Sequence, residues 1–166
     1  MPRATTNDWN VIINAFMFKV QNSPEFFNYF NVEEEEALQL AIRRSRGYLI
    51  ESLSRLTSQT SSSGVDWHDY DNQLDKFNFD ITYEEVDLIA NLMYEMFLVK
   101  DTAKLRVHAQ LLTSQDIKSV YGVGHAERRS FMEMVDRIKH DNNVLIDSYA
   151  SRDRLTGQRK SIEFDN

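Results

Sequence analysis

The sequence contains no cysteine, and this absence excludes disulfide bonds, thiolate metal sites and a cysteine nucleophile. Proline and glycine are scarce, with two and five residues in a chain of 166, which removes most of the turn signals that a many-stranded β fold requires. No apolar run approaches the about 20 residues that cross a bilayer. Residues 1–10 also lack an apolar signal core, so we expect neither a membrane protein nor a secreted one.

Positive charge is also in short supply. The chain has 19 Lys and Arg residues against 26 Asp and Glu residues, which gives a formal net charge of −7. A general electrostatic grip on nucleic acid depends on Lys and Arg side chains that displace counterions from phosphates. The composition therefore argues against such a grip, and any contact with DNA or RNA requires a local basic patch.

Apolar and aromatic residues are plentiful. Hydrophobic residues make up 42% of the chain, with ten Phe, seven Tyr and two Trp, and the length fits one domain with a single core. We predict an all-α fold, a helical bundle of about four to five helices. Residues 1–150 form the single helical domain, residues 57–80 a long acidic and aromatic loop or insertion, and residues 151–166 an extended C-terminal tail.

The spacing of apolar residues predicts helices over residues 8–20, 24–30, 33–56, 83–112 and 126–150. Thr6 or Asn7 can cap the first, and the glutamates at residues 33–36 favour the start of the third. Thr82 and Glu85 have the spacing of a capping box, which places the start of the fourth helix at Tyr83.

The same spacing predicts which faces of these helices are buried. For the first helix the buried residues are Trp9, Ile12, Ile13, Phe16 and Val20. For the third they are Leu38, Ala41, Ile42, Ser45, Leu49, Leu53 and Leu56. For the last they are Phe131, Met134, Val135, Ile138, Leu145 and Tyr149. Residues 86–99 are apolar on nearly every side, as in a central helix that is covered on several sides.

Two clusters of aromatic residues exceed what the helices need. The first contains Phe26, Phe27, Tyr29 and Phe30, and it is either a plug for the core or a surface for a neighbouring subunit. The second contains Trp67, Tyr70, Phe77 and Phe79, in the 57–80 loop. A loop this long is typically functional or disordered. Its aromatic rings predict that it docks, either on a partner or on its own domain.

We find no catalytic, cofactor-binding or metal-binding pattern, and we expect a protein that is not an enzyme. His68 lies among four aspartates, Asp66, Asp69, Asp71 and Asp75, whose oxygens would suit a calcium ion. A calcium loop that begins at Asp69 would place Leu74 where the sharp turn needs glycine, so a solvated acidic loop is the better interpretation. No HExxH pair, GxSxG elbow or phosphate-binding glycine loop is present.

Residues 113–135 offer one alternative function. A short helix, a glycine-containing turn and a following helix in this segment are similar to a helix-turn-helix DNA-binding motif. Arg128 and Arg129 would then contact DNA. The rest of the last helix is amphipathic, which is more typical of a helix that packs on a core.

The segments LQLAIRRSRGYLIESLSRL and DLIANLMYEMFLVKD resemble the helical core of the head–tail connector, or neck adaptor, proteins of tailed bacteriophages. In that family an alanine-led helix with a central aromatic residue, here Ala41 and Tyr48, packs on an apolar helix with a Tyr-Glu pair followed by charge. Here these are Tyr94 and Glu95, then Lys100 and Asp101. The resemblance covers about half of the chain. The long acidic loop, the long last helix and the tail depart from the smaller connectors.

The resemblance implies a structural virion protein that is assembled in the host cytoplasm and lies in the neck, between capsid and tail. Copies would form a ring, expected to be dodecameric, beneath the portal protein. The ring would bind the next neck or tail-completion protein and extend the channel, through which DNA passes without sequence-specific binding. The two aromatic clusters would supply contacts with these partners.

The tail supplies a further set of expected partner contacts: Arg152, Arg154, Arg159, Lys160, Ile162 and Phe164. It would lie against an acidic partner or add a strand to the sheet of a partner. The alternative is a disordered tail.

Overall fold

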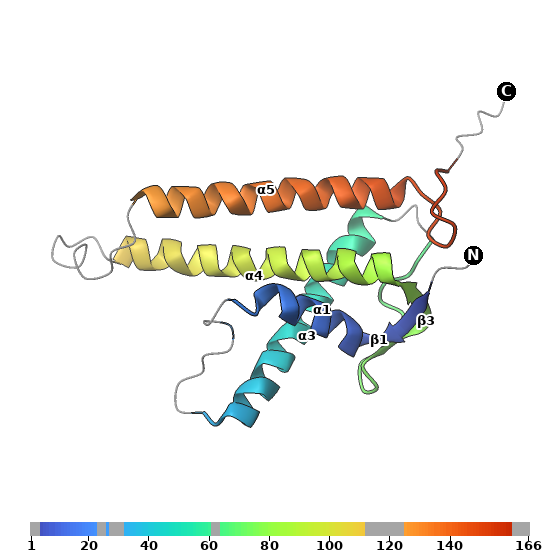
Figure 1. Cartoon of the computed structure of the whole chain (residues 1–166), viewed down its shortest axis with the longest axis horizontal. Coiled ribbons are helices and arrows are strands. Elements are labelled where there is room, and N and C mark those ends of the chain that lie inside the picture. The colour runs from blue at the N-terminus through green and yellow to red at the C-terminus, as the bar shows by residue number, and fades with distance from the viewer. Residues whose placement is uncertain (1–3, 23–25, 27–31, 61–63, 112–124, 161–166) are drawn as a thin grey trace.

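The computed structural model describes residues 4–22, 26, 32–60, 64–111 and 125–160, with side chains left undescribed over residues 101–128. Within these ranges the chain forms four helices and three short strands (Figure 1). The helices are α1 (Trp9–Val20), α3 (Glu34–Gln59), α4 (Tyr83–Leu111) and α5 (His125–Ala150). The strands are β1 (Thr5–Asp8), β2 (Tyr70–Asp71) and β3 (Lys76–Thr82).

The prediction of an all-α fold is wrong, because the strands form an antiparallel sheet in the order β1-β3-β2. In β3 the buried Phe77 and Ile81 alternate with the exposed Asn78 and Asp80, which is the two-residue period of a half-buried strand. Part of the segment predicted as a loop at residues 57–80 therefore belongs to α3 or to this sheet. The turn before β3 uses Asp75 at a φ of 51°, a left-handed conformation that glycine more often adopts.

The first helix and its buried face agree with the prediction. Helix α1 buries Trp9, Ile12, Ile13, Phe16 and Val20, the five residues expected from the spacing. Its cap is different, because the side chain of Asp8 accepts a hydrogen bond of 2.8 Å from the amide of Asn10. Asp8 is the last residue of β1, so the strand leads directly into the helix.

Helix α4 is the centre of the molecule, and α1, α3 and α5 all pack against it. In Figure 1, α5 runs antiparallel along one side of α4, α1 lies on the opposite side, and α3 passes obliquely behind α4. The capping box that begins α4 is confirmed. The amide of Thr82 donates to Oε2 of Glu85 at 2.7 Å, and the amide of Glu85 donates to Oγ1 of Thr82 at 3.3 Å.

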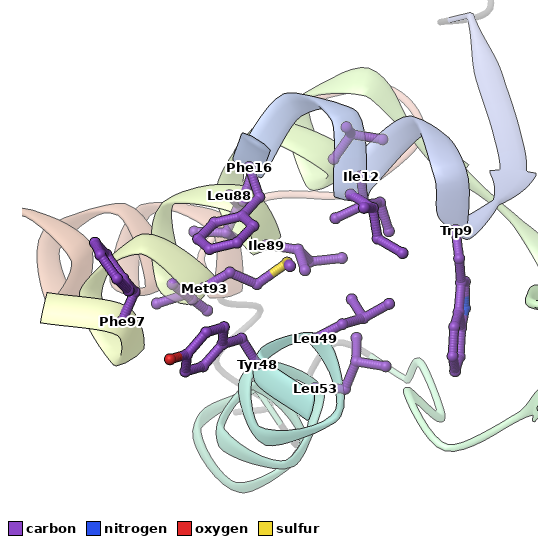
Figure 2. Packing of buried hydrophobic residues seen from close by; sticks show 14 of the residues in the cluster. Trp9, Ile12, Phe16, Tyr48, Leu49, Leu53, Leu88, Ile89, Met93 and Phe97 are labelled. Carbon is purple, nitrogen blue, oxygen red and sulfur yellow. The ribbon is translucent and has the colours of Figure 1, made fainter. Parts of the chain in front are cut away.

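The core between α1, α3 and α4 is rich in aromatic rings (Figure 2). The ring centroid of Tyr48 on α3 lies 5.8 Å from that of Phe16 on α1 and 6.3 Å from that of Phe97 on α4. The predicted buried face of α3 is confirmed at Ala41, Ser45, Leu49, Leu53 and Leu56. It is wrong at Leu38, which is 47% exposed near the start of the helix.

The predicted stripe of α5 is only partly buried. Val135 is buried as expected, and Phe131, Ile138 and Tyr149 are half-buried. Met134 and Leu145 are 39% and 44% exposed. These side chains lie at the edge of the contact because, among the described elements, only α4 packs extensively against α5. No helix in the described residues is long and apolar enough to span a membrane.

Candidate assembly surface

The aromatic residues of the segment predicted as a loop, residues 57–80, pack inside the domain. Trp67 is completely buried, with its ring centroid 6.4 Å from that of Phe77 and 6.0 Å from that of Phe79. Its indole Nε1 donates to Oγ1 of Thr60 at 3.2 Å. Tyr70, which is half-buried, lies edge-on to the ring of Trp9. The segment therefore docks on its own domain, and Trp67 and Phe77 have almost no surface left for a partner.

Phe26 is likewise a core residue. It is completely buried, and its ring lies edge-on to Phe16 at 5.4 Å and to Phe97 at 5.5 Å, measured between centroids. The guanidinium of Arg44 lies 5.1 Å from the centroid of the same ring, on its face. Of the two interpretations of this aromatic cluster, Phe26 fits the core plug. Phe27, Tyr29 and Phe30 lie outside the described residues.

The aspartates that surround His68 are bonded to other groups of the protein. Oδ1 of Asp66 accepts from the amide of His68 at 2.9 Å, and Oδ1 of Asp69 accepts from Nδ2 of Asn78 at 2.7 Å. Oδ1 of Asp71 accepts from the amides of residues 73 and 74. Among the residues that the structure describes, no group of three His, Asp or Glu side chains is placed to hold a metal ion.

The expectation of an extended C-terminal tail is wrong for residues 151–160, which fold into a tight turn. Arg152 and Arg159 form an antiparallel bridge. Oδ1 of Asp153 accepts hydrogen bonds from the amides of Leu155 and Thr156, and Gly157 takes the left-handed conformation with a φ of 71°. These hydrogen bonds, chiefly the one from the amide of Thr156, hold the pKa of Asp153 below its ordinary value. Ile162 and Phe164 lie outside the described residues.

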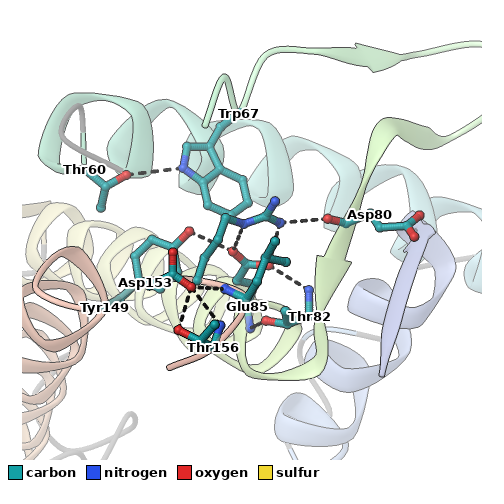
Figure 3. A network of polar contacts seen from close by, with 10 residues as sticks. Thr60, Trp67, Asp80, Thr82, Glu85, Tyr149, Asp153 and Thr156 are labelled. Carbon is teal, nitrogen blue, oxygen red and sulfur yellow. Dashed lines mark hydrogen bonds and ion pairs between the residues drawn. The ribbon is translucent and has the colours of Figure 1, made fainter. Parts of the chain in front are cut away.

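The turn places Arg154 against a buried carboxylate at the start of α4 (Figure 3). Glu85 is 1% exposed. Its Oε1 accepts from Nε of Arg154 at 2.8 Å and from the hydroxyl of Tyr149 at 2.7 Å. Nη2 of Arg154 donates to Oε2 of Glu85 at 3.0 Å and to the carbonyl of Asp80 at 2.7 Å. Arg154, expected to contact a partner, instead joins β3, α4 and the C-terminal turn.

This contact keeps Glu85 charged although it is buried. Burial alone would raise the pKa of Glu85, but hydrogen bonds from Arg154, from the amide of Thr82 and from Tyr149 outweigh it and lower that pKa. Burial and the negative charge of Glu85 raise the pKa of Tyr149, so its hydroxyl remains a donor. The carboxylate accepts four hydrogen bonds in this arrangement, which is typical of a structural ion pair.

A second buried ion pair attaches α5 to α3 and α4. Oε2 of Glu95 on α4 lies 2.8 Å from Nη1 of Arg55 on α3 and accepts a 2.8 Å hydrogen bond from Nδ2 of Asn142 on α5. The same amide nitrogen donates to the carbonyl of Asn91 at 3.3 Å. Asn142 was not among the residues expected to be buried, because an amide inside an apolar stripe gives no hydrophobic signal.

A depression of about 410 Å³ lies between α1, α4 and α5, and we call it the α1–α5 groove. Its lining residues are Lys19 of α1, Asn91 and Tyr94 of α4, and Ile138, Asp141, Asn142 and Leu145 of α5. Near the start of α4 a second depression of about 260 Å³ also borders Asn91 and Leu145. The groove has an apolar wall and charged rims, and it is open to solvent.

The remaining expected contact residues have different positions. Arg152, Arg159 and Lys160 are exposed on the C-terminal turn. Arg129 is exposed on the first turns of α5, where its Nε lies 2.9 Å from Oε1 of Glu133 one helical turn away. The side chain of Arg128 and residues 112–124 lie outside the described part of the chain, so the helix-turn-helix hypothesis stays a prediction.

Comparisons with protein-family models, with curated proteins and with solved structures gave no match to this chain.

Proposed function

We propose that this chain is a structural protein of the neck of a tailed bacteriophage, a head–tail connector that binds the portal protein. In this role copies form a ring that extends the DNA channel and presents a surface to the next neck or tail component. The packing of α3 on α4 is the observation that carries the proposal, because these helices contain the two segments on which the resemblance to connectors rests.

The contacts between α3 and α4 involve the residues that define the resemblance. Tyr48 is 2% exposed and lies against Phe97. Glu95 of the Tyr-Glu pair forms an ion pair with Arg55. Nζ of Lys100 lies 2.6 Å from Oε1 of Glu51 and 4.7 Å from the ring centroid of Tyr48. The two segments thus form one packed unit, and this packing supports the proposal.

Exposed apolar residues also support a role in assembly. Phe18 on α1 is 71% exposed, and Val144 and Leu145 on α5 are 53% and 44% exposed. Side chains of this kind are typical of surfaces that bind other protein chains when they gather on one patch. Leu145 lies in the wall of the groove.

The proposal is tested by mixing the purified chain with the portal protein encoded by the same phage genome. Negative-stain microscopy is expected to show an added ring on the portal, and light scattering the matching increase in mass. A portal that keeps its mass and outline at high concentrations of the chain would contradict the proposal. If the chain instead binds DNA in a salt-dependent way that Arg128→Ala and Arg129→Ala abolish, the helix-turn-helix hypothesis replaces it.

A further inference from the structure

The guanidinium of Arg154 lies in a pocket of the domain, which we call the Glu85 pocket. Nε and Nη2 of Arg154 donate to the two carboxylate oxygens of Glu85 on α4, and Nη2 also donates to the carbonyl of Asp80 on β3. The ring of Phe79 covers one face, with its centroid 5.5 Å from the guanidinium carbon. A planar fork that is bound at its edge and stacked on its face is typical of arginine recognition, and a lysine ammonium fits this arrangement poorly.

Residues outside the C-terminal turn hold the binding groups of the Glu85 pocket in place. The amide of Thr82 and the hydroxyl of Tyr149 each donate to the carboxylate of Glu85 at 2.7 Å. The ring of Phe79 lies edge-on to the completely buried Trp67, with 6.0 Å between centroids. The binding groups are therefore positioned independently of the turn, which lowers the free-energy cost of binding a guanidinium.

The pocket has an opening to solvent. The side chain of Arg154 is 20% exposed, and it lines the depression of about 260 Å³ near the start of α4. The other charged side chains that line this depression are Glu84, Asp87, Asp153 and Arg152. Lys19 pairs with Asp87 at 3.2 Å, so three carboxylates stand beside two cations in addition to the buried carboxylate of Glu85. This balance favours the approach of a cation.

The C-terminal turn presents Arg154 much as a separate ligand would. Its backbone is held by its own hydrogen bonds: the amide of Gly157 donates to the carbonyl of Asp153 at 2.7 Å, and the amide and hydroxyl of Thr156 donate to the carboxylate of Asp153. Within residues 151–160, Arg154 and Gly157 are half-buried and the others are exposed. The attachment of the turn to the domain therefore depends chiefly on the side chain of Arg154.

We infer that the Glu85 pocket is a guanidinium-binding site in its own right, which Arg154 fills in the free chain. When Arg154 is withdrawn, the site takes up a guanidinium from outside the chain, carried by an arginine side chain or by a small alkylguanidinium. The buried carboxylate of Glu85 supplies the charge, and the ring of Phe79 and the carbonyl of Asp80 select the planar group. The inference does not depend on the proposed function, because the pocket and its ligand belong to a single chain.

Chemical rescue of the full-length chain tests the site. Arg154→Ala removes the guanidinium but leaves the binding groups of the pocket, and ethylguanidinium chloride at millimolar concentrations supplies it again. The ligand is expected to recover about half of the lost thermal unfolding midpoint, in a saturable way. Ethylammonium chloride matches the charge and the ionic strength, and it is expected to recover about tenfold less because an ammonium cannot form the fork. Equal recovery with the two salts would overturn the inference.

Two variants show where the ligand binds. Arg152→Ala changes an exposed arginine of the same turn and is expected to gain nothing from ethylguanidinium, and the wild-type chain likewise gains nothing because its site is filled. Glu85→Gln in the Arg154→Ala chain is expected to abolish the rescue. Equal gains in Arg152→Ala and Arg154→Ala would overturn the inference. If Arg154→Ala is unfolded in buffer, the readout is recovery of the helical circular dichroism signal during the titration, and no recovery would also overturn it.

Discussion

Arg154 binds both carboxylate oxygens of Glu85, a residue 69 positions earlier in the chain, through donor–acceptor distances of 2.8 and 3.0 Å. The guanidinium also lies 5.5 Å from the ring centroid of Phe79, on its face. Residues 151–160 are thereby attached to the strand and helix on which the rest of the domain is built. The C-terminal turn is part of the folded domain.

Replacing Arg154 is expected to destabilise the fold. Arg154→Ala leaves the buried carboxylate of Glu85 without its cation, which costs about 2–4 kcal/mol after allowance for the partial exposure of Arg154. Urea unfolding followed by circular dichroism measures the change in the free energy of unfolding. Arg152→Ala is the control, because Arg152 is exposed on the same turn. Equal free energies for the two variants would show that the ion pair does not stabilise the fold.

The same carboxylate predicts how stability depends on pH. The pKa of Glu85 is lower in the folded chain than its ordinary value of 4.5. The ionised carboxylate therefore adds its full contribution to the free energy of unfolding above pH 4.5, and this contribution is lost as the pH falls toward the folded pKa. The free energy of unfolding of the wild-type chain minus that of Glu85→Gln is expected to stay constant near neutral pH and to shrink below pH 4.5. A difference that stays constant into the acid range would contradict a lowered pKa.

Asn142 is expected to hold α5 against α4. Asn142→Ala removes a donor to the buried carboxylate of Glu95, which costs about 1–3 kcal/mol. Amide hydrogen exchange is expected to accelerate along α5 more than along α1, because α1 packs on α4 independently of α5. His140→Ala, an exposed neighbour, is the control. Uniform acceleration in both helices would mean that α5 does not open separately.

The hydrogen bond between Trp67 and Thr60 is expected to fix the segment that leads into the sheet. Thr60→Val keeps the shape of the side chain but leaves the buried indole nitrogen without an acceptor, at a cost of about 1–3 kcal/mol. Thermal unfolding measures the loss, and Thr57→Val is the comparison because Thr57 bonds only to its own helix among described residues. Equal losses of stability would mean that the cost comes from the hydrogen bond that each threonine hydroxyl donates to a carbonyl of α3, and not from the bond between Thr60 and Trp67.

Local features of the fold could be predicted from the sequence. The buried face of α1 follows from residue spacing, and the start of α4 follows from the capping box of Thr82 and Glu85, because each depends on residues within a few positions of one another. The segments around Tyr48 and Phe97 pack together, while the resemblance to connectors stays a prediction. The partner of Glu85 could not be found in this way, since no local pattern connects it to Arg154.

The sheet was missed for a physical reason. Phe77, Phe79 and Ile81 alternate with polar residues, but they follow a run of aspartates that is typical of a loop. The strand is stable because β1, near the start of the sequence, pairs with it, as in the register of Thr5 with Thr82. The exposure of Met134 and Leu145 was missed because helical spacing identifies an apolar face without showing how much of it another helix covers.

Native mass spectrometry of the chain over a range of concentrations, with and without the portal protein, tests the central claim that this protein works by binding copies of itself. The wild-type chain is expected to form one discrete ring, and Leu145→Glu, which places a charge among the exposed apolar residues of α5, is expected to remain monomeric. Leu74→Glu is expected to assemble like the wild type. Monomers at every concentration in both conditions would contradict the account.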